Sequence, residues 1–412
     1  MSKWSIPIST VIILVLSFLP FTAKSNCFPE DQLPKIWQIL WSNKFTPDEL
    51  SNLKSMGVDG VFKCVSYEPD SPDDPVLAGG EWRLVERVEG DYDWSSLQTC
   101  LDNALAADMW FIPEVVINIP PEWFVSRYPD SLLRDYRDIT ATDPNDSGAP
   151  YLLSPWFIAN GEADSYLEPF ISSFIALVSQ YPNVPAVMIG NFKLNVLPWK
   201  MGSDDNDDFD YWPIFDSYAL SSYADEFGVG ESPPETMEDY LAMGDVEKSA
   251  FENWLIEAMC DNLETRYLDW LSGFTGWKVI NVSIWDNDGV KESIFTTQTP
   301  SMISIKQAAI LASGVHNVII NDDNMGDCWL AARQQDDIYL ANENGFLIYG
   351  ERVLPEVCTW EQMYDMWAAF NPLPDGLINI GNGDAYWMGE FRSLYGPISN
   401  PLTKTYLPLV LN

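Results

Sequence analysis

The feature that most constrains this chain is a repeated alternation of short apolar runs with segments that carry helical periodicity or helix caps. Short apolar runs bounded by turn residues are typical of buried strands. Strands that alternate with helices form parallel sheets, because each parallel pair needs a crossover connection. Eight such units predict an α/β fold, a (β/α)8 TIM barrel. The predicted strands are 36–41, 61–67, 110–118, 186–190, 279–285, 318–321, 346–350 and 377–380.

Two helix starts carry a specific signal. Thr46 is followed by Glu49, and Thr359 is followed by Gln362. A threonine with glutamate or glutamine three residues later is a capping box, in which each side chain accepts from the other residue's backbone N–H. We therefore expect one helix to follow the first strand and another to follow the seventh.

A single barrel domain accounts for most of the 412 residues. We assign it to 28–395, with a mostly helical insertion at 193–271 after the fourth strand. A plain barrel of this type needs about 250 residues, so long insertions are expected. The remaining segment, 396–412, is predicted to be a C-terminal tail that packs on the barrel.

The first residues, 1–25, have the pattern of a secretory signal peptide. Lys3 supplies the positive charge, 6–21 the apolar stretch, and Ala23 and Ser25 a small-x-small cleavage site. Prolines interrupt the apolar stretch, which argues against the alternative of a retained membrane anchor. We expect a secreted, extracellular protein that does not associate with a membrane after signal cleavage.

The chain is strongly acidic, with a net charge of −39. Such a surface repels phosphate groups, so nucleic acid and anionic membranes are poor partners. The simplest interpretation of the charge is solubility outside the cell. Composition alone does not indicate an oligomeric state.

We predict no metal and no cofactor. The chain has one histidine, which disfavours a cysteine and histidine metal site, and its six cysteines fit disulfides in an exported protein. Cys328 and Cys358 are the first pairing to test, because both should lie just beyond adjacent strands. The acidic loop 204–210 spaces oxygens as a calcium loop does, but it lacks the turn glycine and the distal glutamate, so a solvated loop is the better interpretation.

The residues at the predicted strand ends are carboxylates and amides. In a parallel barrel, the carboxyl ends of the strands carry the functional groups. No serine–histidine pair or phosphate-binding glycine loop competes with them, and the chain contains 18 tryptophans. Carboxylates flanked by tryptophan favour glycoside hydrolysis on an oligosaccharide or polysaccharide. The rim set is Glu68, Asn118, Asn191, Asp286, Asp288, Asp322, Asp323, Glu351, Asn382 and Asp384.

Glu351 is the principal catalytic candidate, because it closes the seventh apolar run just before the chain turns into a helix. Glu68, Glu114, Asp286 and Asp322 are the candidates for a second catalytic carboxylate. Glu114 lies within the third strand, where burial would raise its pKa if its side chain points into the barrel. A chain this acidic will also carry rim carboxylates by chance, and each tryptophan could simply pack under a loop. The predicted substrate-binding residues are Asn191, Trp123, Trp285, Asp286, Trp387 and Glu68.

Four motifs give a resemblance to known families. The segments EP at 68–69, GDYDW at 90–94 and PPEWF at 120–124 resemble the progression found in clan A glycoside hydrolases, above all family 42 β-galactosidases. The segment GERVLP at 350–355 resembles the GENALP segment of β-amylases. Both resemblances imply a barrel with a catalytic glutamate at the end of strand seven, and both align it with Glu351.

The chain departs from these families at strand four. The resemblance implies an asparagine followed by the acid/base glutamate, but here Asn191 is followed by Phe192. On the β-amylase pattern the position falls near Val196, which is not a carboxylate either. Two interpretations follow. The protein hydrolyses O-glycosidic bonds with an acid from another strand, or it is a non-catalytic glycan-binding barrel, a pseudo-glycosidase. A structural surface protein without a saturable ligand is a third alternative.

Overall fold

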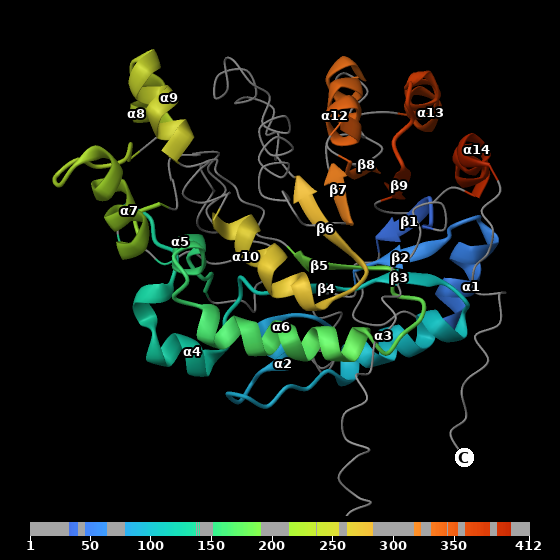
Figure 1. Ribbon diagram of the computed structural model, residues 1–412, viewed down its shortest axis with the longest axis horizontal. Helices are drawn as coiled ribbons and strands as arrows, with labels where there is room; N and C mark the ends of the chain where they lie inside the picture. Colours follow the sequence, from blue (N-terminus) through green and yellow to red (C-terminus); the bar gives the residue numbers. More distant parts are fainter. Residues whose placement is uncertain are drawn as a thin grey trace, which may run out of the picture.

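We describe the protein from a computed structural model (Figure 1). The predicted signal peptide 1–25, the acidic loop 204–210 and nearly all of the predicted tail 396–412 lie outside the described residues. The structure describes 33–39, 46–63, 79–136, 138, 140, 151–190, 214–235, 237–254, 262–282, 317–322, 331–343, 345–352, 359–379 and 385–396.

The strands form one parallel sheet that closes on itself. Nine strands follow in the order β3-β2-β1-β9-β8-β7-β6-β5-β4, and each neighbouring pair in this order is parallel. The two ends of this order, β3 (Trp110–Ile112) and β4 (Glu114–Val116), are consecutive in the chain and separated only by Pro113. The Pro113 carbonyl accepts a bond from the backbone of Met188, on β5. Counting β3 and β4 as one interrupted strand gives the eight strands of the predicted TIM barrel.

The observed strands match the predicted ones within a few residues. The interruption at Pro113 was not predicted; proline lacks the N–H that a strand interior needs. The other bounds are β1 (Ile36–Ile39), β2 (Gly60–Phe62), β5 (Ala186–Gly190), β6 (Trp277–Val282), β7 (Val318–Asp322), β8 (Leu347–Arg352) and β9 (Gly376–Asn379).

The seam between the first and last strands is joined by side chains as well as backbone. Gln38 on β1 is in register with Asn379 on β9. The Asn379 amide donates to the Gln38 carbonyl at 2.6 Å, and the Gln38 amide donates to the carbonyl of Ile39 at 2.9 Å. Both side chains are buried. The two ends of the barrel sequence are therefore connected inside the protein.

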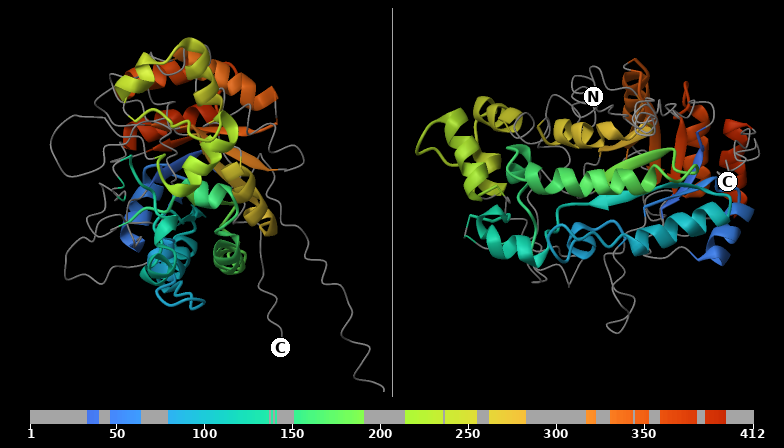
Figure 2. Two further views of the ribbon diagram at one scale, coloured as in Figure 1. Left: turned by 90° about the vertical axis from the view of Figure 1, so that its left-hand side faces the viewer. Right: turned by 60° about the horizontal axis from the view of Figure 1, so that its bottom comes forward.

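Helices surround the strands, as a (β/α) barrel requires. Figure 1 shows α3 and α6 along one side of the strands and α12, α13 and α14 on the other, and Figure 2 shows the same layers from two further directions. The bounds are α1 (Pro47–Ser55), α2 (Trp82–Val85), α3 (Ser95–Ala106), α4 (Glu122–Arg127), α5 (Pro155–Ala159), α6 (Asp164–Val178), α7 (Ser217–Phe227), α8 (Met237–Ala242), α9 (Asp245–Trp254), α10 (Asn262–Trp270), α12 (Ala331–Glu343), α13 (Trp360–Ala369) and α14 (Ala385–Tyr395).

Both predicted capping boxes are confirmed. Thr46 caps α1 with Glu49, and Thr359 caps α13 with Gln362, each with both reciprocal bonds. Cys100 in α3 is disulfide-bonded, and the other five cysteines, with the Cys328–Cys358 pairing, lie outside the described residues. Within the described ranges, no helix has the length and hydropathy needed to cross a membrane.

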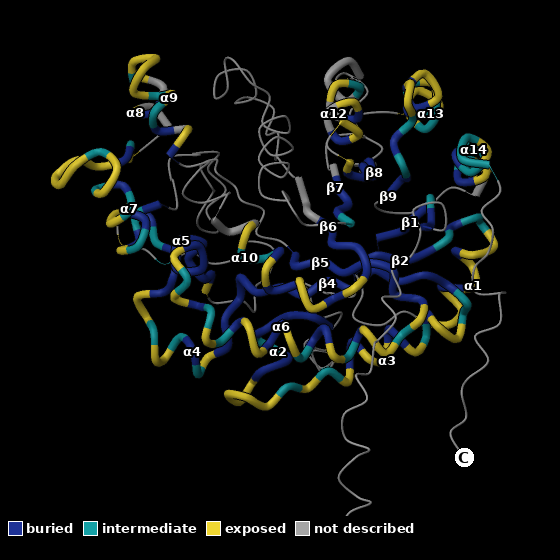
Figure 3. The backbone as a smooth tube through the Cα atoms, in the orientation of Figure 1, coloured by how far each residue is buried: buried dark blue, intermediate teal, exposed yellow. Residues whose placement is uncertain are grey.

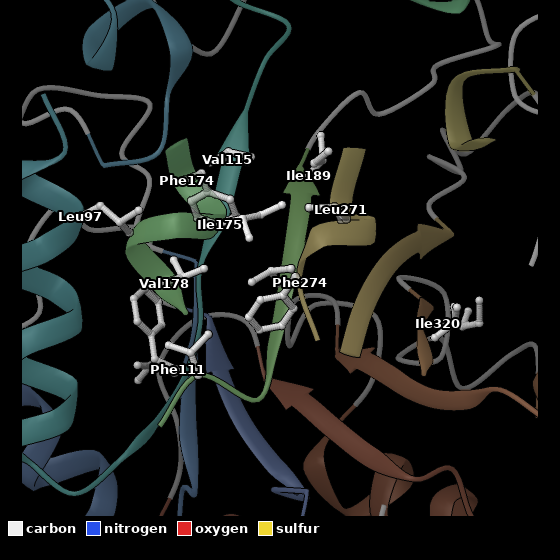
Figure 4. Packing of buried hydrophobic residues seen from close by; sticks show 14 of the residues in the cluster. Leu97, Phe111, Val115, Phe174, Ile175, Val178, Ile189, Leu271, Phe274 and Ile320 are labelled. Atoms are coloured by element: carbon white, nitrogen blue, oxygen red, sulfur yellow. The ribbon is translucent and has the colours of Figure 1, made fainter. Parts of the chain in front are cut away.

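Figure 3 shows that the strands are mostly buried, whereas the surrounding helices also carry exposed residues. Alternate residues of the strands belong to two separate apolar layers. One row points into the barrel and the other points out to the helices, because successive side chains of a strand lie on opposite faces. Figure 4 shows the outer layer, in which Phe174, Ile175 and Val178 of α6 lie against residues of β3, β4 and β5. The inner cluster is Leu33, Trp37, Ile39, Phe62, Trp110, Ile112, Ala186, Met188, Trp277, Val279, Ile319, Leu347, Tyr349 and Ile378.

The helices of the predicted insertion form a third apolar cluster around Trp156 of α5. Its ring stacks on Trp254 of α9, with centroids 4.6 Å apart. Ser154 caps α5 and donates to the carboxylate of Asp216, which in turn caps α7 by accepting from two backbone N–H groups. Burial of Asp216 raises its pKa to about 6, against the opposing effect of these hydrogen bonds. This chain of caps attaches the inserted helices to the barrel.

Candidate functional site

Position 351 lies at the carboxyl end of a barrel strand, where the sequence analysis predicted the catalytic carboxylate. β8 is the seventh barrel strand, and its residues Leu347 and Tyr349 belong to the inner cluster, whereas Ile348 belongs to the outer layer. Glu351 is two residues beyond Tyr349 and is in register with Ile378, another inner residue. Strand alternation therefore assigns position 351 to the inner face at the carboxyl end of β8. The side chain of Glu351 is outside the described part of the structure.

The neighbouring strand β7 places a different residue on the inner row from the one we predicted. Ile319 is an inner residue and Ile320 an outer one, so Asn321 continues the inner row. Asn321 is fully buried. Asp322 follows on the alternate row, in register with Gly350, and its side chain is not among those described. The catalytic role of Asp322 stays a prediction, and strand alternation from Ile319 would have drawn attention to Asn321.

Glu114 is a charged residue inside the barrel. It continues the inner row of Trp110 and Ile112 across Pro113, while Val115 faces the outer layer. Its side chain is fully buried. This position agrees with the reason for choosing Glu114, namely a carboxylate pointing into the barrel from the third strand. Its predicted catalytic role is not tested by position alone.

The carboxylate of Glu114 reaches the end of the next strand. The backbone of Glu114 is in register with Met188 on β5, but its carboxylate lies against Gly190, two residues further on. Any Cβ at position 190 would collide with Oε1 of Glu114. Glycine at the last position of β5 is therefore what makes room for a carboxylate that originates on β4.

Lys63 supplies a buried cation to this carboxylate. Its Nζ lies 3.6 Å from Oε2 of Glu114, and the two side chains are only 4% and 0% exposed. Lys63 follows the last residue of β2 and has a φ of 71°, which is uncommon for a residue with a side chain. Its N–H still donates to the carbonyl of Ile112 at 3.0 Å. The left-handed backbone breaks the strand alternation after the inner residue Phe62, and the ammonium group lies beside Glu114.

Trp123 is held in an aromatic cluster. Its indole N–H donates to the carbonyl of Glu86 at 2.8 Å, and its ring meets Trp82 edge-on with an interplanar angle of 86°. The guanidinium of Arg127 lies over the Trp123 ring, 5.5 Å from its centroid. These contacts account for Trp123 as a packing residue, and sugar stacking on it stays a prediction.

Trp387 lies near the start of α14, just after the eighth barrel strand. Its ring is half-buried and contacts Tyr386 at 5.1 Å and Tyr364 at 6.0 Å between centroids. Tyr386 is 65% exposed. The aromatic group at this part of the molecule is thus partly open to solvent. The sequence analysis selected Trp387 but missed Tyr386, although the two residues are adjacent.

Four predicted site residues cannot be placed. Within the described ranges, no group of three or more histidine, cysteine, aspartate or glutamate side chains is arranged to hold a metal ion. The structure does bring Lys63, Glu114 and Gly190 together from three strands. The predicted site residues outside the described ranges are Glu68, Asn191, Trp285 and Asp286, and the predicted rim residues outside them are Asp288, Asp323, Asn382 and Asp384.

Comparison with known proteins finds similarity only at the level of structure. No family model and no curated protein sequence matches the chain. The catalytic domain of β-amylase from Paenibacillus polymyxa superposes with a TM-score of 0.53 at 12% identity, covering 90% of this chain and 97% of that one. A β-galactosidase from the psychrophilic Marinomonas ef1 gives a TM-score of 0.50 at 11% identity, and the match covers 84% of this chain and 53% of that enzyme.

These likenesses concern the fold, since both identities are far below the level at which sequence carries function. They agree with the closed parallel sheet, its surrounding helices and the order of its strands. The chain is a (β/α)8 barrel that resembles, in its fold, the barrels of glycoside hydrolases.

Proposed function

We propose that this chain is an exported carbohydrate-active protein that hydrolyses O-glycosidic bonds, with Glu351 as its central carboxylate. The observation that carries the proposal is the register of β8. Position 351 continues the inner row of Leu347 and Tyr349 at the carboxyl end of the seventh strand. In barrels of this type, that edge holds the reacting groups.

The chemistry needs two functions at the scissile bond. One carboxylate attacks the anomeric carbon or activates water, and a second group protonates the leaving oxygen. Glu351 takes the first function in this proposal. An oligosaccharide or polysaccharide is the proposed substrate, in line with the resemblance of the motifs around 68–69, 90–94, 120–124 and 350–355.

A second candidate function is glycan binding without turnover. It is favoured by one observation, the pairing of Lys63 with Glu114. A carboxylate next to a buried ammonium keeps its charge and does not readily donate a proton. Protonation of a leaving group typically contributes about 10²–10⁴-fold in rate, so a barrel without a proton donor would turn over slowly or not at all.

The decisive experiment compares wild type with Glu351→Gln on a panel of oligosaccharides and aryl glycosides. We expect the variant to lose at least about 10²-fold in kcat, because the amide cannot act as nucleophile or base. Glu343→Gln is the matched control, since Glu343 is an exposed residue at the end of the preceding helix, α12.

Two results would contradict the hydrolase. Equal activity of wild type and Glu351→Gln would remove Glu351 from the mechanism. Saturable sugar binding by calorimetry, with no turnover of even activated aryl glycosides, would favour the glycan-binding barrel instead.

A further inference from the structure

We propose that Lys63 is a positioning residue that holds Glu114 as a carboxylate at the end of the fourth barrel strand. Glu114 then supplies a negative charge at this place and does not act as a proton donor. The consequence for substrates rests on the proposed hydrolase function. Glycosides with leaving groups that depart as stable anions are the substrate class that fits such a site.

The first part of the argument is the route of the side chain. Glu114 belongs to the third barrel strand, but its carboxylate occupies the space in front of Gly190, the last residue of the fourth. Gly190 is on the inner row, because Ala186 and Met188 are inner residues. The inner position at the end of the fourth strand is therefore filled by a carboxylate that belongs to another strand.

The second part is the backbone of Lys63. A strand that continued its alternation beyond Phe62 would direct residue 63 toward the outer layer. The φ of 71° instead accompanies an ammonium group within 3.6 Å of Glu114. A lysine in the left-handed region costs conformational energy and persists only where the surrounding structure enforces it. Here the surrounding structure holds Lys63 in this conformation, with its ammonium group beside Glu114.

The third part is the charge that results. Burial alone would favour the protonated form of a glutamate, but a cation a few ångströms away favours the ionised form. Another buried carboxylate near β4 is Glu81, which bridges to Val116 through its backbone. Glu81 is matched by Arg83, with Nε 2.8 Å from Oε1. The ammonium of Lys63 lies 3.6 Å from Oε2 of Glu114, and we infer from this proximity that Glu114 is ionised at neutral pH.

An ionised Glu114 restricts the reaction. When the bond between the anomeric carbon and the leaving oxygen breaks, both electrons go to that oxygen, which must be stable as an anion. Water supplies the hydroxyl group to the anomeric carbon, and the remaining proton goes to Glu351 as base and then to solvent. No step takes a proton from Glu114.

Infrared difference spectroscopy tests the charge state directly. Wild type and Glu114→Gln are compared between pH 5 and 8. We expect their difference spectrum to show no carbonyl band of a protonated carboxyl group, because Glu114 is ionised in wild type. Lys63→Met should produce this band, and the double variant Lys63→Met/Glu114→Gln should remove it. Lys63→Arg, which keeps the charge, should resemble wild type. Lys54→Met is the matched control, because Lys54 pairs with Asp108 at the surface with both side chains more than 40% exposed.

A band in wild type that disappears in Glu114→Gln would overturn the proposal. So would its absence from folded Lys63→Met. If Lys63→Met does not fold, the comparison of wild type with Glu114→Gln still decides the question.

Leaving-group dependence tests the chemical consequence. Across a series of aryl and alkyl glycosides, wild type should lose at least 10²-fold from the best to the poorest leaving group. Lys63→Met should reduce this difference at least tenfold, because a protonated Glu114 can then supply the proton. An unchanged dependence, with the infrared band present, would show that Glu114 does not reach the leaving oxygen. If no glycoside is hydrolysed, the proposed function fails, while the infrared result still stands on its own.

Discussion

The two ends of the barrel interior are filled by different kinds of side chain. Near the start of the strands, the inner row consists of large apolar groups, including Trp37, Trp110 and Trp277. Near the strand ends, the same row contains Glu114 and Asn321, with the ammonium of Lys63 beside it. The first arrangement removes apolar surface from water, which stabilises the fold. The second buries charge, which stabilises it little or not at all. The apolar end therefore contributes to the stability of the fold, whereas the charged end is where we propose that the function lies.

The largest expected effect on the free energy of unfolding comes from removing a large side chain at the apolar end of the barrel interior. Trp37 is fully buried, and its ring packs directly on Gly60 of β2. Trp37→Ala should lower the free energy of unfolding by about 3–5 kcal/mol, because it leaves a cavity in the barrel. Urea denaturation measures this. A loss below about 1 kcal/mol would show that the apolar end does not carry the stability of the barrel.

The next largest loss of stability is expected at the charged end of the barrel interior, where Glu114 lies against Gly190. Gly190→Ala places a methyl group where Oε1 of Glu114 lies, so the carboxylate must move away from its position. We expect a loss of about 3 kcal/mol, the upper end of what overpacking a core usually costs. Glu114→Ala in the same chain frees this space, so the double variant should lose less than the sum of the two single variants. A double-mutant cycle by denaturation measures the coupling. Additive losses would mean that the two residues are not in contact.

The smallest expected effect on stability concerns Asp216, a buried carboxylate that is held by hydrogen bonds, whereas Glu114 lies beside a cation. Asp216 is held by hydrogen bonds from Ser154 and two backbone N–H groups, and its pKa is raised to about 6 by burial. The folded state therefore binds its proton more tightly than the unfolded state, so stability falls as pH rises from about 4 to about 6. Asp216→Asn should abolish this fall and be roughly 1–2 kcal/mol more stable than wild type at pH 7.

Unfolding measured at several pH values checks this third prediction. The difference between wild type and Asp216→Asn should be small near pH 4 and reach its full size above pH 6. A difference that does not change with pH would show that the carboxylate of Asp216 is ionised throughout. Serine at position 154 must be retained in both proteins, because it donates to this carboxylate.

The sequence predicted the architecture because its signals are local. The apolar runs, their alternation with helices and the capping residues Thr46 and Thr359 all depend on neighbours in the chain. The position of Glu351 on the seventh strand was predicted by counting the apolar runs along the chain. These are the features that period and capping chemistry specify without knowledge of distant contacts.

The candidate site depends on contacts that a linear pattern does not contain. The reach of Glu114 is set by a glycine on the following strand, 76 positions later (190 minus 114). The direction of Lys63 depends on one left-handed residue, which alternation does not reveal. Trp123 was predicted to bind substrate, and the hydrogen bond that its indole donates to the backbone of Glu86 could not be predicted from the sequence. In each case the deciding neighbour comes from another element.

The hydrogen bond between the side-chain amides of Gln38 and Asn379 has a consequence for how the chain closes. If β1 shifted by one residue along β9, the two amides would move to different positions, and Trp37 would exchange faces with its neighbours. Each separated amide would then be enclosed without its partner, at a cost of about 1–3 kcal/mol. The hydrogen bond thus favours a single register between the first and the last strand of the barrel.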